Sequence, residues 1–240
     1  MFEREREQLL DSLDVAHAAY HAVQVFGGPS LYFHGRALAM AKDADCDKFA
    51  ESVYALLTAW GMHRMGRGGS KMVDYGEFYD SLKSLWQMIK ALQQAVPEEL
   101  GVDGWRDLEL VFRGIRCMKT KTSLVGNSKV MAHALPNLVP PIDREYTLRF
   151  LYGSTNITNG LDREWKMMQS ILRDFFYPVL GSEAFKARTE KWFDDERTHN
   201  WNTSGLKIVD NLIIGLMKHQ QRERSPSKPA QESEDAHDDD

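Results

Sequence analysis

The sequence is poor in cysteine and has no long apolar run. Its 240 residues include two cysteines, Cys46 and Cys117, which stand far apart. Two distant cysteines provide neither a disulfide framework nor the close pairs of a metal finger. No stretch is long enough to span a bilayer, and the first ten residues, MFEREREQLL, are charged where a signal peptide needs an apolar run. These absences predict a cytoplasmic protein without a membrane partner.

A complete zinc-site signature is also missing. The eight histidines form no recognisable motif of a zinc enzyme, so we predict neither a catalytic metal nor another cofactor. Hydrophobic residues make up 42% and charged residues 27% of the chain, values of an ordinary globular protein with a core. The length fits one large domain or two small ones.

Charge is unevenly distributed along the chain. Residues 221–240 contain seven acids and three bases, and the preceding part is nearly neutral, with 27 Lys and Arg against 28 Asp and Glu. Residues 111–131 contain no acid and five bases, which are Arg113, Arg116, Lys119, Lys121 and Lys129. Such a basic strip favours a phosphate backbone, and therefore DNA, as partner. A solvated helix face followed by a loop is the alternative interpretation.

Apolar residues recur at three- and four-residue spacing over most of residues 1–220. This pattern predicts a compact all-α domain, which we expect to be monomeric. Glycine and proline mark the predicted breaks between helices, among them Gly126, Pro136, Pro140-Pro141 and Pro178. No run alternates as a strand does. Residues 221–240 lack an apolar anchor and are predicted to form a disordered acidic tail.

The densest chemical information lies in residues 120–152. Gly126 predicts a tight turn, after which Asn127 or Ser128 caps a helix that ends at Pro136. The prolines at 140 and 141 predict a stiff extended link, and Asp143 then opens a further helix. Two roles are open for this carboxylate. It can cap the helix, or it can act in catalysis as a rigidly held negative charge.

This segment resembles the helix-hairpin-helix superfamily of DNA glycosylases. Leu124-Val125-Gly126-Asn127-Ser128 matches the hairpin that grips a DNA phosphate through backbone N–H groups, with Ser128 in place of the second glycine. Pro141-Ile142-Asp143 matches the Pro-x-Asp element that presents the catalytic carboxylate. The string from Ser128 to Arg149 also looks like helical glycosylase-like proteins of phages and anti-phage defence loci, which act on modified bases. The resemblance implies a glycosylase-type helical fold over residues 1–220.

The resemblance also implies a reaction and a set of site residues. A modified base would be flipped into a pocket, and Asp143 would guide water to the anomeric carbon, leaving an abasic site. Lys129 lies one residue away from the nucleophile of lyase-competent members, which implies a monofunctional hydrolase, and four cysteines for an iron–sulfur centre are absent. Tyr146, Trp60 and Tyr32 are the candidates for stacking on the base. The remaining predicted DNA contacts are Lys121, Gly126, Asn127, Ser128, Lys129 and Arg144.

The N-terminal half adds a glycine-rich basic loop at residues 61–71. Its glycines free backbone amides, and Arg64, Arg67 and Lys71 supply charge, so it is a candidate phosphate cradle or a loop without a ligand. The Gly-x4-Gly-Lys-Ser/Thr order of a Walker loop is absent. His63 is either a proton donor to the leaving base or a cation at a helix C-terminus. Further polar groups suited to a cleft or to base edges occur at residues 32–36 and 199–203.

Three functions are therefore considered. The first is a glycosylase that removes a modified base, including hypermodified phage bases. The second is a pyrimidine-modifying enzyme on the same scaffold, which transfers or rearranges a base substituent. The third is a non-catalytic DNA-binding or interaction module, in which Asp143 is only a helix cap.

Overall fold

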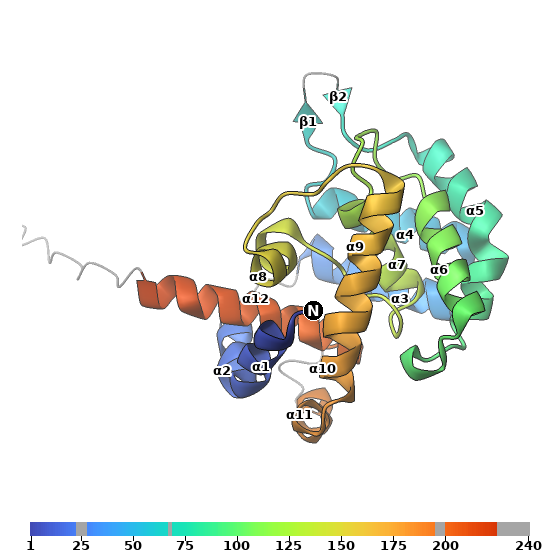
Figure 1. Cartoon of the computed structure of the whole chain (residues 1–240). Coiled ribbons are helices and arrows are strands. Elements are labelled where there is room, and N and C mark those ends of the chain that lie inside the picture. The colour runs from blue at the N-terminus through green and yellow to red at the C-terminus, as the bar shows by residue number, and fades with distance from the viewer. Residues whose placement is uncertain (23–27, 67–68, 195–199, 225–240) are drawn as a thin grey trace, which may run out of the picture.

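Helices make up nearly all of the regular structure, as the apolar spacing predicts. The computed structural model describes residues 1–22, 28–66, 69–194 and 200–224 (Figure 1). The helices are α1 (Glu3–Asp11), α2 (Leu13–His21), α3 (Pro29–Lys42), α4 (Cys46–Ala59), α5 (Tyr75–Leu92), η1 (Pro97–Glu99), α6 (Val102–Gly114), α7 (Leu124–Ala134), η2 (Arg144–Leu148), α8 (Arg149–Tyr152), α9 (Leu161–Ile171), η3 (Leu172–Phe176), α10 (Tyr177–Gly181), α11 (Glu183–Asp194) and α12 (Gly205–Arg224). Two strands of two residues each, β1 (Met65–Gly66) and β2 (Gly69–Ser70), pair antiparallel within the glycine-rich loop.

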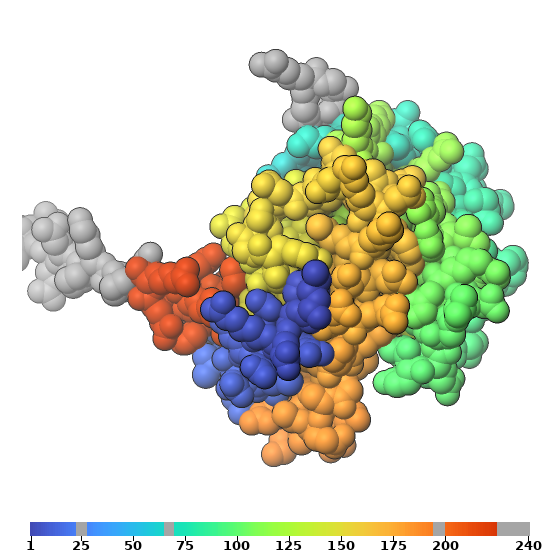
Figure 2. Space-filling view, in the orientation of Figure 1, coloured from blue at the N-terminus to red at the C-terminus, as the bar shows by residue number. Residues whose placement is uncertain are grey.

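Helix α12 packs along α2 and joins the two ends of the described chain. The space-filling view shows the N-terminal residues in dark blue against the red C-terminal helix and the orange α9–α11 segment (Figure 2). A Cβ on Gly215 of α12 would lie 1.9 Å from the Ala16 carbonyl oxygen of α2. The two backbones therefore touch at this point, and only a residue without a side chain fits between them.

A second group of helices packs around α3, α4 and α7. Helix α3 lies against α4 and α7, and α5 lies against α4 and α6. Gln93, at the end of α5, donates hydrogen bonds to the Ala41 carbonyl of α3 and to the Ala134 carbonyl of α7. These bonds satisfy carbonyl groups that helix ends leave without intrahelical partners. Buried apolar side chains from both groups of helices form one continuous core.

Pro178 does not break the helix that contains it, contrary to the sequence-based prediction. Residues 161–181 run as α9, η3 and α10 in succession, and Pro178 is the second residue of α10. The segment η3, just before it, is a π turn. Its wider spacing leaves room for the proline ring, which in a continuous α-helix collides with the preceding turn.

The boundary of the predicted tail also needs correction. Residues 221–224 belong to α12, which ends at Arg224 rather than at residue 220. The remainder of the predicted tail, residues 225–240, lies outside the described residues.

Replacing Gly215 by alanine should destabilise the protein. Alanine normally stabilises a helix relative to glycine by about 1 kcal/mol, but here its methyl group collides with the backbone of α2. We expect the free energy of unfolding to fall by about 3 kcal/mol, as overpacked cores do. Urea unfolding of Gly215→Ala measures the change.

Gly35→Ala is the matched control. Gly35 lies within α3, and a Cβ built on it has no atom within 4 Å. This variant should be as stable as the wild type or up to about 1 kcal/mol more stable. Equal effects of the two substitutions would contradict the close contact between α2 and α12.

Candidate functional site

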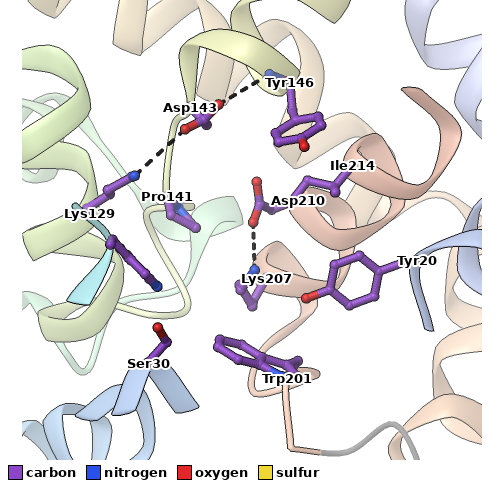
Figure 3. A pocket seen from close by; sticks show the side chains of 11 residues that line it. Tyr20, Ser30, Lys129, Pro141, Asp143, Tyr146, Trp201, Lys207, Asp210 and Ile214 are labelled. Carbon is purple, nitrogen blue, oxygen red and sulfur yellow. Dashed lines mark hydrogen bonds and ion pairs between the residues drawn. The ribbon is translucent and has the colours of Figure 1, made fainter. Parts of the chain in front are cut away.

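A cavity of about 350 Å³ lies where the α2–α12 pair meets α3, α4 and α7. One wall comes from α2, α12 and the segment before α12, and another comes from α3, α7 and the end of α4. The link before η2 and the π turn itself supply the rest. The lining residues are Tyr20, Ser30, Trp60, Lys129, Pro141, Asp143, Tyr146, Trp201, Lys207, Asp210 and Ile214. Figure 3 shows the two carboxylates facing the same open space.

Asp143 is fixed at the start of the π turn η2. Its Oδ1 accepts hydrogen bonds from the backbone N–H groups of Glu145 at 2.8 Å and Tyr146 at 3.3 Å. Its own N–H donates to Thr147 Oγ1, and its carbonyl accepts from the Leu148 N–H, the spacing of a π turn. Asp143 is therefore a helix cap, as one of the two predicted roles required, and its second oxygen points toward Lys129 at the wall of the cavity (Figure 3).

Lys129 of α7 supplies the positive charge beside this carboxylate. Its Nζ lies 3.7 Å from Asp143 Oδ2 and 4.9 Å from the centre of the Trp60 ring. Burial lowers the pKa of the Lys129 ammonium group, and the Asp143 carboxylate opposes that shift. Trp60, Lys129, Asp143 and Tyr146, four of the predicted site residues, are thus brought together in one cavity.

The predicted hairpin is wrong. Helix α7 already begins at Leu124, so Gly126 lies inside its first turns and makes no tight turn. Its small size serves packing instead, because an added Cβ would lie 2.5 Å from Cys117 Sγ. The first amide of the predicted hairpin, Leu124 N, is also occupied, since the buried Glu164 carboxylate accepts hydrogen bonds from it and from the preceding Ser123 N.

Asn127 and Ser128 have internal contacts rather than the predicted DNA contacts. Both are buried. Asn127 Nδ2 donates to the carbonyl groups of Phe112 and Ile115 and so holds the end of α6. Ser128 Oγ accepts from the Ile142 N–H, which ties the proline-containing link to α7 and sets the position of the neighbouring Asp143.

The sequence analysis missed the buried ion pair between Lys207 and Asp210. Lys207 Nζ donates to Asp210 Oδ2 at 2.7 Å and to the Asn211 side-chain oxygen. Burial by itself would lower the pKa of Lys207, but the Asp210 carboxylate raises it on balance. The sequence does show that Lys207, Asp210 and Ile214 are spaced three and four residues apart. They therefore share one face of the helix, and the other face is apolar.

Two buried histidines support both tryptophans of the cavity. His34 Nδ1 and His133 Nε2 are 2.8 Å apart, and His133 Nδ1 lies 2.7 Å from the Lys129 carbonyl oxygen. A carbonyl only accepts, so His133 Nδ1 carries a proton, and His34 donates to His133. The His34 ring stacks on Trp201 at 5.2 Å, and the His133 ring lies 5.6 Å from that of Trp60.

The other predicted residues lie outside the cavity. Tyr32 of α3 is 62% exposed and packs on Phe33, and it does not line the pocket. His63 is exposed, and its Nδ1 lies 3.0 Å from the Thr58 carbonyl at the end of α4, the position predicted for a helix C-terminal cation. Arg64 and Arg144 are exposed. Arg67 lies outside the described residues.

A basic edge forms where residues 71–73 pair with residues 117–119. Lys119 N donates to the Lys71 carbonyl at 2.8 Å, and the side chains of Lys71, Lys119 and Lys121 are exposed. Acids from other segments lie beside several bases of the predicted strip, among them Asp74, whose Oδ1 is 3.8 Å from Lys119 Nζ. Arg113 pairs with Glu109 and Asp162, and Arg116 lies 3.8 Å from Glu77.

The protein should lose stability in acid because of the two buried histidines. Burial lowers the pKa of His34 to about 2 and that of His133 to about 4, from the ordinary value of 6.5. Below pH 6.5 the two histidines become protonated in the unfolded chain, whereas in the folded protein they stay neutral. The contribution of the neutral histidines to the free energy of unfolding is therefore fully present above pH 6.5. It is lost as the pH falls toward 4, by an amount on the order of several kcal/mol. Urea unfolding between pH 7 and pH 4 measures it.

The double variant His34→Gln/His133→Gln is the control for this dependence. It should be less stable than the wild type at pH 7, because the chain of hydrogen bonds is altered. Between pH 6.5 and pH 4 its stability should fall less steeply. A wild-type slope that persists in the variant would assign the pH dependence to other groups.

The function of the cavity has to be argued from its own chemistry. No family model and no curated protein matches the sequence, and no solved structure matches the fold. Among the described residues, no helix is long and apolar enough to cross a membrane, and no group of three or more His, Cys, Asp or Glu side chains is placed to hold a metal ion.

Proposed function

We propose that this protein is a DNA glycosylase that binds a flipped base in the cavity and hydrolyses its N-glycosidic bond. The observation that carries the proposal is the position of Asp143, a carboxylate fixed by two backbone N–H groups on the wall of an aromatic-lined cavity. The volume of about 350 Å³ is at the lower end of small-molecule sites, which suits a single base rather than a long ligand.

The aromatic and the charged side chains of the cavity have different roles in the proposed reaction. Trp60, Tyr146 and Trp201 offer ring surfaces on which an extruded base can stack. As the bond between the sugar and the base breaks, its electron pair leaves with the base and positive charge develops on the deoxyribose. Asp143 offsets that charge and accepts a proton from the water that attacks the anomeric carbon. Lys129 holds the carboxylate in place.

The DNA backbone is assigned to the basic edge. Lys71 follows Trp60, which lines the cavity, by eleven residues in the sequence, and Lys71 pairs through its backbone with Lys119. A duplex whose phosphates lie along Lys71, Lys119 and Lys121 would be held by charge alone, without sequence preference.

Release of free base from DNA tests the proposal. The protein is incubated with unmodified DNA, with alkylated or deaminated DNA, and with phage DNA that carries hydroxymethylated or glucosylated cytosine. Mass spectrometry identifies the released base, and alkali cleavage reveals the abasic sites. Asp143→Asn should lower the rate of release by about 10²- to 10⁴-fold, the usual contribution of such a group.

Glu145→Gln is the matched control. Glu145 is exposed, follows Asp143 by two residues and pairs with Arg149, so its substitution should leave the rate within about two-fold of the wild type. Absence of base release from every DNA, with DNA binding unchanged in Asp143→Asn, would contradict the glycosylase and return Asp143 to the role of a cap alone. Transfer of a base substituent without release would favour the base-modifying enzyme.

Neutralising the basic edge should weaken DNA binding at all sequences alike. For Lys71→Gln/Lys119→Gln/Lys121→Gln, we expect the slope of log affinity against log salt to become shallower by about 0.9 for each phosphate that the protein no longer neutralises. Fluorescence anisotropy with a labelled duplex measures it. The control removes three exposed lysines elsewhere, Lys166, Lys186 and Lys191, on α9 and α11. Equal slopes for the two triple variants would exclude the assigned edge.

A further inference from the structure

The ion pair between Lys207 and Asp210 faces the cavity with spare hydrogen-bonding capacity. An ammonium group has three N–H donors, and Lys207 uses two of them on Asp210 and Asn211. Asp210 accepts through Oδ2, and among the described residues no group donates to its Oδ1. In Figure 3 this second oxygen points away from Lys207, toward the space between Pro141 and Tyr146. A charged donor and a charged acceptor thus stand side by side at the cavity wall.

Stability of the fold does not explain such a pair. Lys207 is 9% exposed and Asp210 is 3% exposed, so both charges have left water almost completely. Removing an ion from water costs several kcal/mol, and apolar residues of similar size often replace a buried pair without loss of stability. Binding of a ligand by the spare donor and the spare acceptor would explain why this ion pair is buried at the cavity wall.

We propose that Lys207 and Asp210 select a base that presents a carbonyl oxygen beside a ring N–H, as uracil, thymine, hypoxanthine and guanine do. The Lys207 ammonium donates to the carbonyl oxygen, and Asp210 Oδ1 accepts from the neighbouring N–H. This inference rests on the proposed glycosylase, and it names the class of base that the enzyme takes.

The charges of the two groups favour this lactam edge over the edge of cytosine or adenine. Hydrogen bonds to ionised groups are stronger than those between neutral groups. The ring N–H of a lactam is more acidic than an amino group of cytosine or adenine, so it is the better donor to the Asp210 carboxylate. Cytosine and adenine present a ring nitrogen beside an amino group instead. A lactam base also leaves as an anion whose charge spreads onto its carbonyl oxygens, where the Lys207 ammonium stabilises it until solvent supplies a proton.

Nucleoside binding tests the preference, and the tryptophans of the cavity provide the signal. Quenching of the tryptophan fluorescence, to which Trp60 and Trp201 in the cavity contribute, is followed with deoxyuridine, deoxyinosine, deoxycytidine and 3-methyldeoxyuridine. The methyl group of the last nucleoside replaces the ring N–H and keeps both carbonyl oxygens. Deoxyuridine and deoxyinosine should bind at least ten-fold more tightly than the other two, which corresponds to about 1.4 kcal/mol.

The double variant Lys207→Met/Asp210→Leu removes both charges together, so that neither is left buried alone. It should keep its circular dichroism and thermal unfolding and lose the ten-fold preference. The control is Glu183→Leu/Lys186→Met, which removes a pair of the same three-residue spacing from the exposed surface of α11. That variant should retain the preference.

The outcomes separate the inference from the proposed function. Base release that depends on Asp143, together with a lactam preference that is absent or that survives in Lys207→Met/Asp210→Leu, overturns the inference and keeps the glycosylase. A preference that depends on the pair, without base release from any DNA, supports the recognition role and contradicts the glycosylase. Binding of none of the four nucleosides overturns the inference.

Discussion

The contact between α2 and α12 is the constraint on which the rest of the site depends. The two helices touch backbone to backbone at Gly215, and this close approach brings Tyr20 of α2 next to Lys207 and Asp210 of α12. A wider separation would open the ion pair to water, where it would lose its electrostatic strength. The packing of two small residues thus sets the electrostatic character of a wall of the cavity.

A second constraint is the π turn that follows Asp143. Pro140 and Pro141 stiffen the approach, Ser128 anchors the link through Ile142, and the π turn presents its first amides to the carboxylate. π turns are rare and occur often at functional positions. The local geometry of this segment holds one side chain in place, and the second oxygen of that side chain remains available to the cavity.

The sequence predicted the all-α fold and part of the candidate site for identifiable reasons. Helical spacing of apolar residues depends on local geometry, so it can be read without tertiary information. Trp60, Lys129, Asp143 and Tyr146 stood in motifs whose residue types suit the chemistry, and the structure brings them together. Neither helical spacing nor packing tests the predicted functions, because those functions depend on the chemistry of the site.

Other features could not be read from local sequence. A glycine that packs against a neighbouring segment looks the same as a glycine that makes a turn, and only the contact with Cys117 distinguishes the two for Gly126. Lys207 and Asp210 stand among the polar positions of an amphipathic pattern, and such positions are usually solvated, so the local sequence gives no sign of their burial. Their burial follows from α2, which lies almost two hundred residues earlier in the chain.

That separation has a consequence for how the protein is made. Domains fold as the chain leaves the ribosome, N-terminal parts first. A nascent chain that has reached residue 200 already contains Tyr20, Lys129 and Asp143, but it lacks Trp201, Lys207 and Asp210. Until α12 emerges, the apolar face of α2 has no helix to cover it. The cavity is therefore complete only after α12 has been made, and a chain that stops before α12 has no complete cavity in which to hold a ligand.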